Sequence, residues 1–168
     1  VYKRQHLDRG LVKSLIKTIP SEITLHARNP EKTVALGGRQ SIFIPMTGAP
    51  YLRDLEDVRR APTLDDLATF HKLAHMLPAM HSSAHHIVEP MDHPISHRHL
   101  RITHSSMLYS DKTFMGMTTS GQNAEDVLDM CAILFGEEYL ETHAVVTGNC
   151  NGNLSLIHIS EPTRHRLI

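Results

Sequence analysis

Helix-like and strand-like apolar patterns alternate along most of this chain, and this alternation limits its fold more than any other feature does. Apolar residues recur at helical spacing in three stretches, residues 63–77, 96–109 and 123–135. A strand-like stretch follows each of them, at residues 80–88, 113–118 and 144–147. Strands and helices that alternate through short links predict parallel βαβ units. We therefore expect an α/β protein, although a barrel and an open doubly wound sheet both begin in this way.

The first part of the chain predicts smaller elements of mixed type. Residues 7–19 have the apolar spacing of a short amphipathic helix, and residues 22–27 alternate like a strand. Residues 33–36 and 41–44 flank two adjacent glycines, a pattern typical of a β-hairpin. We expect a small α+β region here, ahead of the βα units.

The two ends of the chain look non-native. One set of codons for residues 1–5 has a reverse complement that translates as Leu-Ser-Leu-Ile-His, the sequence of residues 154–158. Two unrelated native termini would almost never encode the two strands of one DNA segment, whereas a sequencing-library transposon end does. We expect residues 1–5 and 154–168 to be a sequencing-adapter scar, which fold reasoning leaves out. The native part then divides into the α+β region at residues 6–45 and the βα units at residues 46–153.

Charge and composition exclude several classes of protein. The 17 basic and 18 acidic residues nearly balance, so no electrostatic argument favours nucleic acid or an anionic membrane as a partner. No apolar run approaches the length of a membrane span. The two cysteines, Cys131 and Cys150, make neither a disulfide framework nor a zinc motif. We predict a cytoplasmic protein that binds neither nucleic acid nor membranes.

Histidine is the unusual residue, with 14 in the chain. A zinc site would favour two histidines four positions apart on a helix, as His71 and His75 are. His81 and His85 have the same separation, but on a predicted strand, where their side chains lie too far apart. No cysteine accompanies either pair. We predict no metal site, and keep a His-rich metal-binding module as an alternative. Elemental analysis of the protein would show whether it holds a metal.

Six short motifs keep their order and spacing over residues 6–153. They are His-Ala-Arg-Asn-Pro-Glu at residues 26–31 with Gly37-Gly38, residues 43–50 with Asp54-Leu55, Arg59-Arg60 with Thr63-Leu64-Asp65-Asp66, Glu89-Pro90-x-Asp92-x-Pro94 with Arg98-His99-Leu100, Ser110-Asp111-Lys112-x-Phe114, and Gly148-Asn149-x-Asn151-x-Asn153. One such motif would be weak support, but six in register are strong. Together they resemble the trimethylamine methyltransferase family.

This resemblance implies a fold and an activity. Members of the family are TIM-barrel proteins much longer than this chain. The implied fold class is α/β, with an incomplete TIM (β/α)8 barrel preceded by the small α+β region. Members move a methyl group from trimethylamine, or from a quaternary amine such as glycine betaine, to the cobalt of a small corrinoid protein, as in methanogenesis and other methylamine metabolism. The chain itself would bind no cofactor, because the partner carries the corrinoid, and the full-length protein would be a homo-oligomer.

The candidate site residues follow from where a TIM barrel places its chemistry. The family puts the nucleophile on cobalt, so the protein mainly positions the reactants. In a TIM barrel this work falls to residues at the carboxyl ends of the strands. A carboxylate there could attract a methylammonium group, and asparagine amides could orient a carboxylate such as that of betaine. We predict five substrate-binding residues and assign no catalytic one: Glu89, Asp92, Thr119, Asn149 and Asn151.

These candidates have a structural alternative. Glu89 and Asp92 could cap the following helix, and the asparagines could make turns. Aromatic faces commonly bind quaternary ammonium groups, but the chain has no Trp. We interpret the aromatic residues near predicted strand ends as core rather than cage: Phe43, Tyr51 and Phe114.

The sequence therefore predicts a fragment of an amine methyltransferase, and an inactive truncated product is the further alternative. A barrel pocket is assembled from the loops after all eight strands. We expect this fragment alone to be inactive.

Overall fold

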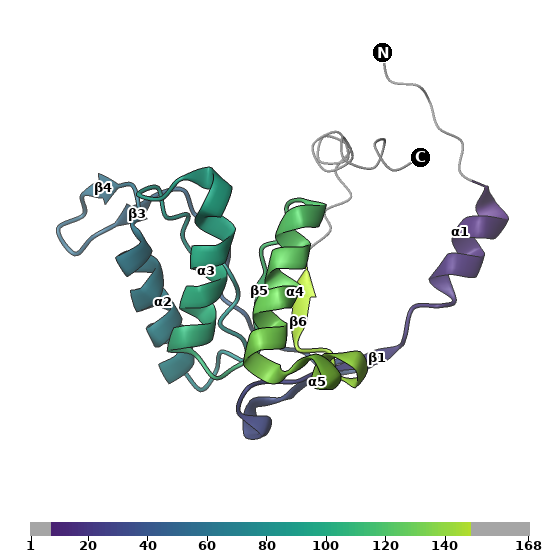
Figure 1. Cartoon of the computed structure of the whole chain (residues 1–168). Coiled ribbons are helices and arrows are strands. Elements are labelled where there is room, and N and C mark those ends of the chain that lie inside the picture. The colour runs from purple at the N-terminus through teal and green to yellow at the C-terminus, as the bar shows by residue number, and fades with distance from the viewer. Residues whose placement is uncertain (1–7, 149–168) are drawn as a thin grey trace, which may run out of the picture.

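The N-terminal region forms a helix followed by a small antiparallel sheet. The computed structural model describes residues 8–148. The elements of this region are α1 (Arg9–Ile16), β1 (Glu22–Leu25), the 3-10 turn η1 (Pro30–Lys32) and β2 (Val34–Gly37) (Figure 1). Helix α1 begins where the Asp8 carboxylate accepts a hydrogen bond from Leu11 N at 2.7 Å. The predicted helix and first strand of this region are confirmed.

The predicted hairpin is wrong in its pairing. β2 pairs with β1, and residues 41–44 form no strand. Phe43 instead exchanges hydrogen bonds with His81, which donates from its backbone N to Phe43 O at 2.9 Å and accepts from Phe43 N through Nδ1 at 3.0 Å. The reason lies at Gly37, which has a φ of 106° and where a Cβ would collide with Ser21 O. Glycine lets the chain turn away from the sheet directly after β2.

The rest of the chain alternates helices with short strands. The helices are α2 (Leu64–Met76), α3 (Ile95–Tyr109), α4 (Gly121–Phe135) and α5 (Glu137–Thr142). The strands are β3 (Leu52–Arg53), β4 (Arg59–Arg60), β5 (Phe114–Gly116) and β6 (Val146–Gly148). The three predicted helices are confirmed as α2, α3 and α4, and the last two predicted strands as β5 and β6. The β3–β4 hairpin and α5 have no counterpart in the prediction.

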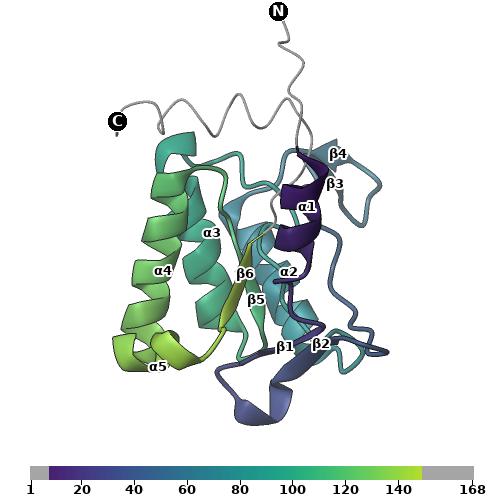
Figure 2. The same cartoon turned by 90° about the vertical axis from the view of Figure 1, so that its right-hand side faces the viewer.

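Four segments of this part lie side by side and run in the same direction. β5 pairs with β6 in parallel (Figure 2). A parallel bridge between Ser82 and Thr113 joins the preceding segment to β5, and one between Ala49 and Val88 joins the first segment to that one. We call the four segments the parallel layer: residues 48–49, residues 82–89, β5 and β6. The end at which the chain leaves each of them is the carboxyl edge. Parallel βαβ pairing is therefore confirmed for these segments.

The second segment of the layer is irregular, so the regular strand predicted at residues 80–88 is wrong. Ala84 has a positive φ of 57°, and its backbone N donates to Ser82 Oγ at 3.1 Å. Ser83 Oγ lies 2.9 Å from Ser106 Oγ on α3. Polar side chains thus take hydrogen bonds that a regular ladder would need, because serine competes with the backbone for such partners.

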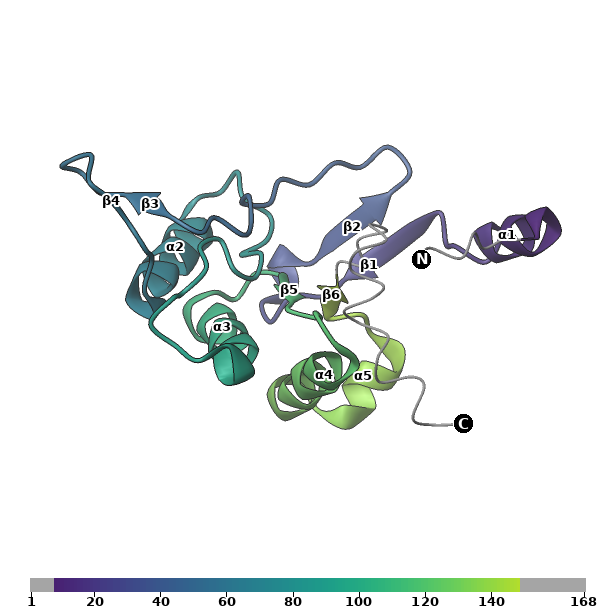
Figure 3. The same ribbon diagram turned by 90° about the horizontal axis from the view of Figure 1, so that it is seen from above.

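Helices α2, α3 and α4 lie on one side of the parallel layer (Figure 3). Leu67 of α2 and Ile102 of α3 bury Val88 of the layer between them. A second apolar cluster joins α3, α4 and the last two strands: Met107, Phe114, Val127, Cys131 and Val145. No helix within residues 8–148 is long and apolar enough to cross a membrane.

Gly116 marks the closest approach of α4 to the layer and gives a first prediction. A Cβ at Gly116 would lie 2.7 Å from Val127 Cγ1 and 3.3 Å from Val146 Cγ2. We expect Gly116→Ala to lower the free energy of unfolding by about 2 kcal/mol, because the buried, β-branched Val127 cannot move aside without strain. Urea denaturation measures this change. Gly121→Ala is the matched control: a Cβ there meets nothing within 4 Å. If Gly116→Ala and Gly121→Ala change the free energy of unfolding equally, the packing around Gly116 accepts a Cβ without strain.

Candidate functional site

Asp92 lies at the carboxyl edge and caps a helix. Its Oδ1 accepts a hydrogen bond from Leu64 N at 3.0 Å, at the first residue of α2. Thr63 and Asp66 complete the cap, because Asp66 N donates to Thr63 Oγ1 and Thr63 N donates to Asp66 Oδ2. The Asp92 charge therefore faces the positive end of the α2 dipole. Asp92 caps the preceding helix in the chain, whereas the structural alternative had it cap the following one.

Glu89 follows the second segment of the layer and forms an ion pair. Its Oε1 lies 2.7 Å from Arg98 Nη1, and its backbone N donates to Ala49 O at 2.9 Å. Arg98 also donates to His93 O from Nε at 3.2 Å and from Nη2 at 2.7 Å. The side chains of Glu89 and Arg98 are 19% and 12% exposed. The first turn of α3 thus holds the carboxylate in place.

His86 lies beside Glu89 and is a site residue that the sequence prediction missed. Its Nε2 is 3.8 Å from Glu89 Oε2, and its ring centroid is 4.0 Å from that of His85. Burial lowers the pKa of His86, while the Glu89 carboxylate acts in the opposite direction. Within residues 8–148, His86 Nδ1 is buried and has no hydrogen-bond partner. The regular strand predicted at residues 80–88 gave no reason to expect that the His86 ring points toward Glu89.

Of the three remaining predicted site residues, the structure describes one. Thr119 is exposed after β5, and its Oγ1 accepts a hydrogen bond from Asn123 Nδ2 at 2.8 Å. It stands near the start of α4, where Ser120 caps the helix. Asn149 and Asn151 lie outside the described residues. The structure therefore brings Glu89 and Asp92 to one loop and places Thr119 after the next strand of the layer.

The histidine pairs are not arranged as metal ligands. His71 is fully buried, with Nδ1 2.9 Å from Ser105 Oγ and Nε2 2.7 Å from His85 O. Both of its ring nitrogens are therefore occupied. Across residues 8–148, no three His, Cys, Asp or Glu side chains form a group that could hold a metal ion.

The aromatic residues near the segment ends differ from the interpretation that all are core. Phe114 is 3% exposed and belongs to the core, as predicted. Tyr51 is 51% exposed, and the Arg59 guanidinium lies 3.9 Å from its ring centroid. Phe43 is 65% exposed and stacks on His81. Tyr51 follows the first segment of the layer, so it is an exposed aromatic at the carboxyl edge.

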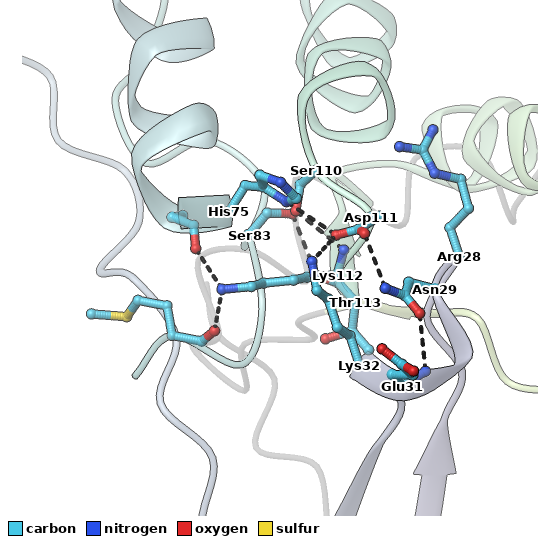
Figure 4. Close-up of polar contacts among 12 residues, drawn as sticks. Arg28, Asn29, Glu31, Lys32, His75, Ser83, Ser110, Asp111, Lys112 and Thr113 are labelled. Atoms are coloured by element: carbon cyan, nitrogen blue, oxygen red, sulfur yellow. Dashed lines mark hydrogen bonds and ion pairs between the residues drawn. The ribbon is translucent and has the colours of Figure 1, made fainter. Parts of the chain in front are cut away.

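A second polar cluster lies at the opposite edge of the layer and joins two of the sequence motifs (Figure 4). The Asp111 carboxylate accepts hydrogen bonds from Lys32 Nζ at 2.5 Å and Asn29 Nδ2 at 3.3 Å, and lies 3.0 Å from His75 Nδ1. Lys32 and the neighbouring Asn29 lower the pKa of the Asp111 carboxyl against the opposing effect of burial. The motif at residues 26–31 and the motif around Asp111 therefore meet in space.

Lys112 stabilises the end of α2 from the same cluster. Its Nζ donates to three backbone carbonyls, Ala74 O at 2.8 Å, Leu77 O at 2.7 Å and Met80 O at 2.7 Å. A cation at the C-terminus of a helix also complements the helix dipole. A groove of about 370 Å³ adjoins Lys112. With its donors occupied, Lys112 holds the backbone together and has no donor left for a ligand.

Comparison with known proteins places the chain in a family. Residues 2–163 match the family trimethylamine methyltransferase. The chain is 46% identical over 134 residues to glycine betaine methyltransferase from Desulfitobacterium hafniense (strain Y51). That match covers 80% of this chain and 28% of the relative, so the chain spans less than a third of the relative's length. The matched range includes part of both ends that the sequence predicts to be a scar, and the scar stays a prediction. Because the family match covers far more than half of its residues, the chain belongs to the trimethylamine methyltransferase family.

Proposed function

We propose that this chain is part of a methyltransferase that moves a methyl group from a methylated amine to the cobalt of a small corrinoid protein. The observation that carries the proposal is the 46% identity with glycine betaine methyltransferase over most of the chain. The placement of Glu89 and Asp92 at the carboxyl edge supports it, since the chemistry of α/β proteins gathers at that edge.

We further propose that the parallel layer is the opening part of a TIM barrel, with the small α+β region before it. Three features of the described residues support this. The segments of the layer are parallel, a helix follows each of the first three, and these helices lie on one side of the layer (Figure 3). In a barrel the helices cover the outside, and the other face of the sheet is the barrel interior.

Among the family substrates, a quaternary amine that also carries a carboxylate fits the described residues better than trimethylamine does. The two carboxylates at the carboxyl edge already have partners, because Glu89 pairs with Arg98 and Asp92 caps α2. A substrate with a net positive charge would need an anion that is not compensated in this way. Glycine betaine has no net charge. We therefore propose glycine betaine, or a similar betaine, as the substrate.

The cobalt of the partner would supply the nucleophile, and the residues of this chain would orient the substrate. Tyr51 is a half-exposed aromatic ring at the carboxyl edge, next to the first segment. The Arg59 guanidinium lies 3.9 Å from its ring centroid, and a quaternary ammonium group would have to replace it there. The Thr119 hydroxyl is exposed after β5. The partner must reach the same edge to take the methyl group. The full-length protein is proposed to act in the cytoplasm as a homo-oligomer.

The full-length protein, supplied with its reduced corrinoid protein, tests the proposal. We expect methyl transfer from glycine betaine, followed through the visible spectrum of the corrinoid, and slower or no transfer from trimethylamine. Glu89→Gln should lower kcat/KM about tenfold, because a neutral amide leaves the Arg98 charge uncompensated beside the substrate. His97→Ala is the control, since His97 is exposed on α3. Equal rates for Glu89→Gln and wild type would remove Glu89 from the site. No transfer from either amine by the wild-type protein would contradict the proposed function.

A further inference from the structure

Three side chains at the carboxyl edge form a row of cation, anion and imidazole. Arg98 Nη1 lies 2.7 Å from Glu89 Oε1, and Glu89 Oε2 lies 3.8 Å from His86 Nε2. The three side chains are 12%, 19% and 20% exposed, so water screens their interactions only in part. The Glu89 charge therefore acts on Arg98 and on His86 at the same time.

Backbone hydrogen bonds fix the Arg98 guanidinium and the main chain of Glu89. Arg98 donates twice to His93 O, which sets the plane of its guanidinium. Glu89 N donates to Ala49 O, which fixes the backbone of Glu89 against the first segment of the layer. An ion pair whose guanidinium is already held costs less side-chain entropy than a pair between two mobile side chains. The geometry thus favours Arg98 over His86 as the partner of Glu89.

We propose that Arg98 is a positioning residue: it keeps Glu89 as its ion-pair partner, so that His86 stays neutral beside a substrate whose reacting end is cationic. The proposal rests on the proposed function for the charge of the substrate, but not for the geometry. An imidazolium at His86 would repel the ammonium end of any methylated amine. A neutral imidazole does not repel the ammonium end.

The groups that face His86 agree with this role. Glu89 is the anion that raises the pKa of His86, and burial lowers it. His85, from the same segment, meets the His86 ring edge to face, and burial lowers its pKa to about 4. His71 reaches His85 from α2, and burial lowers its pKa as well. The first segment contributes Gly48, which carries no charge. Arg98 is thus the cation that decides how much of the Glu89 charge acts on His86.

An NMR titration of the His86 ring in the full-length protein tests the proposal without any assay of activity. In Arg98→Met, Glu89 loses its competing partner, and we expect the pKa of His86 to rise by about one unit. Arg98→Lys keeps the positive charge and should titrate like the wild-type protein. Arg101→Met, on the exposed side of the same helix, is the matched control. The His86 signal is assigned by its loss in His86→Gln.

Kinetics then separate the two proposals. In Arg98→Met we expect KM for the amine to rise about tenfold at low pH and to recover above the raised pKa of His86, with kcat little changed. If Arg98 had only a structural role, Arg98→Met would lower the melting temperature but leave the pKa of His86 unchanged. That result would overturn the proposal. If Arg98→Met does not fold, Glu89→Gln must lower the pKa of His86 instead; no change there would equally overturn it. A shifted titration in a protein that demethylates no amine would support the positioning role and contradict the proposed function.

Discussion

Replacing Lys112 by Met is expected to destabilise the protein by about 4 kcal/mol, because three carbonyls lose a charged donor at once. The Nζ of Lys112 lies within 2.8 Å of each of Ala74 O, Leu77 O and Met80 O. Lys112 is 7% and Ala74 3% exposed, so little water can reach the Ala74 carbonyl that Lys112 leaves, whereas Leu77 and Met80 are more exposed. Burial lowers the pKa of Lys112, yet the three acceptors make sense only for an ammonium group.

Urea denaturation measures this effect as a lower midpoint with an unchanged slope. Lys13→Met is the matched control, because Lys13 is exposed on α1, and it should change the free energy of unfolding by less than about 0.5 kcal/mol. Lys112→Arg keeps the charge but not the compact shape of the ammonium group. Its free energy of unfolding should lie between those of Lys112→Met and Lys13→Met. A loss below about 1 kcal/mol in Lys112→Met would mean that water replaces the ammonium at the end of α2.

Acidification is expected to destabilise the protein between about pH 6.5 and pH 4 through its buried histidines. Burial, with smaller effects from His86 and His71, lowers the pKa of His85 to about 4. The folded pKa is below that of the unfolded chain, so the unfolded chain binds more protons throughout this range. The contribution of neutral His85 is complete above about pH 6.5 and is lost as the pH falls toward 4, by roughly 3 kcal/mol.

His85→Leu tests the origin of this loss. Leu removes the titrating ring and keeps the backbone carbonyl that His71 needs. We expect the free energy of unfolding of this variant, measured in urea at a series of pH values, to fall less steeply between pH 6.5 and 4 than that of the wild-type protein. His104→Gln, at an exposed position of α3, should keep the wild-type dependence. Parallel curves for wild type and His85→Leu would assign the acid sensitivity to other groups.

Elements whose signals are local could be predicted from the sequence. Helix α2 is the clearest case, because Thr63 and Asp66 form their cap within three residues of each other. Helix α4 is predicted from the helical spacing of its apolar residues, and the structure adds the local cap, where Ser120 Oγ accepts from Asn123 N. Strands β5 and β6 were found in the right places and order. A strand's partner, in contrast, depends on residues far away, and so β2 was paired with the wrong neighbour.

The candidate site was only partly predictable for the same reason. The position of Glu89 and Asp92 after a segment of the layer follows from the chain order. Their partners do not, because Asp92 caps a helix that begins 28 residues earlier and Glu89 pairs with a residue of the next helix. His86 was missed because a period-two pattern describes a regular strand, and Ala84 interrupts that pattern with a positive φ. The clustering of Asp111, Lys32 and Asn29 is likewise a tertiary contact.

Helix α1 stands apart from α2, α3 and α4 (Figure 1). It has 8 residues, none of them buried. Leu11, Leu15 and Ile16 are each more than half exposed. A helix shorter than about 12 residues is marginal in water unless it packs against something. We therefore expect its amide hydrogens to exchange with solvent through local fraying, whereas the amide hydrogens of the parallel layer should exchange only when a larger part of the structure opens.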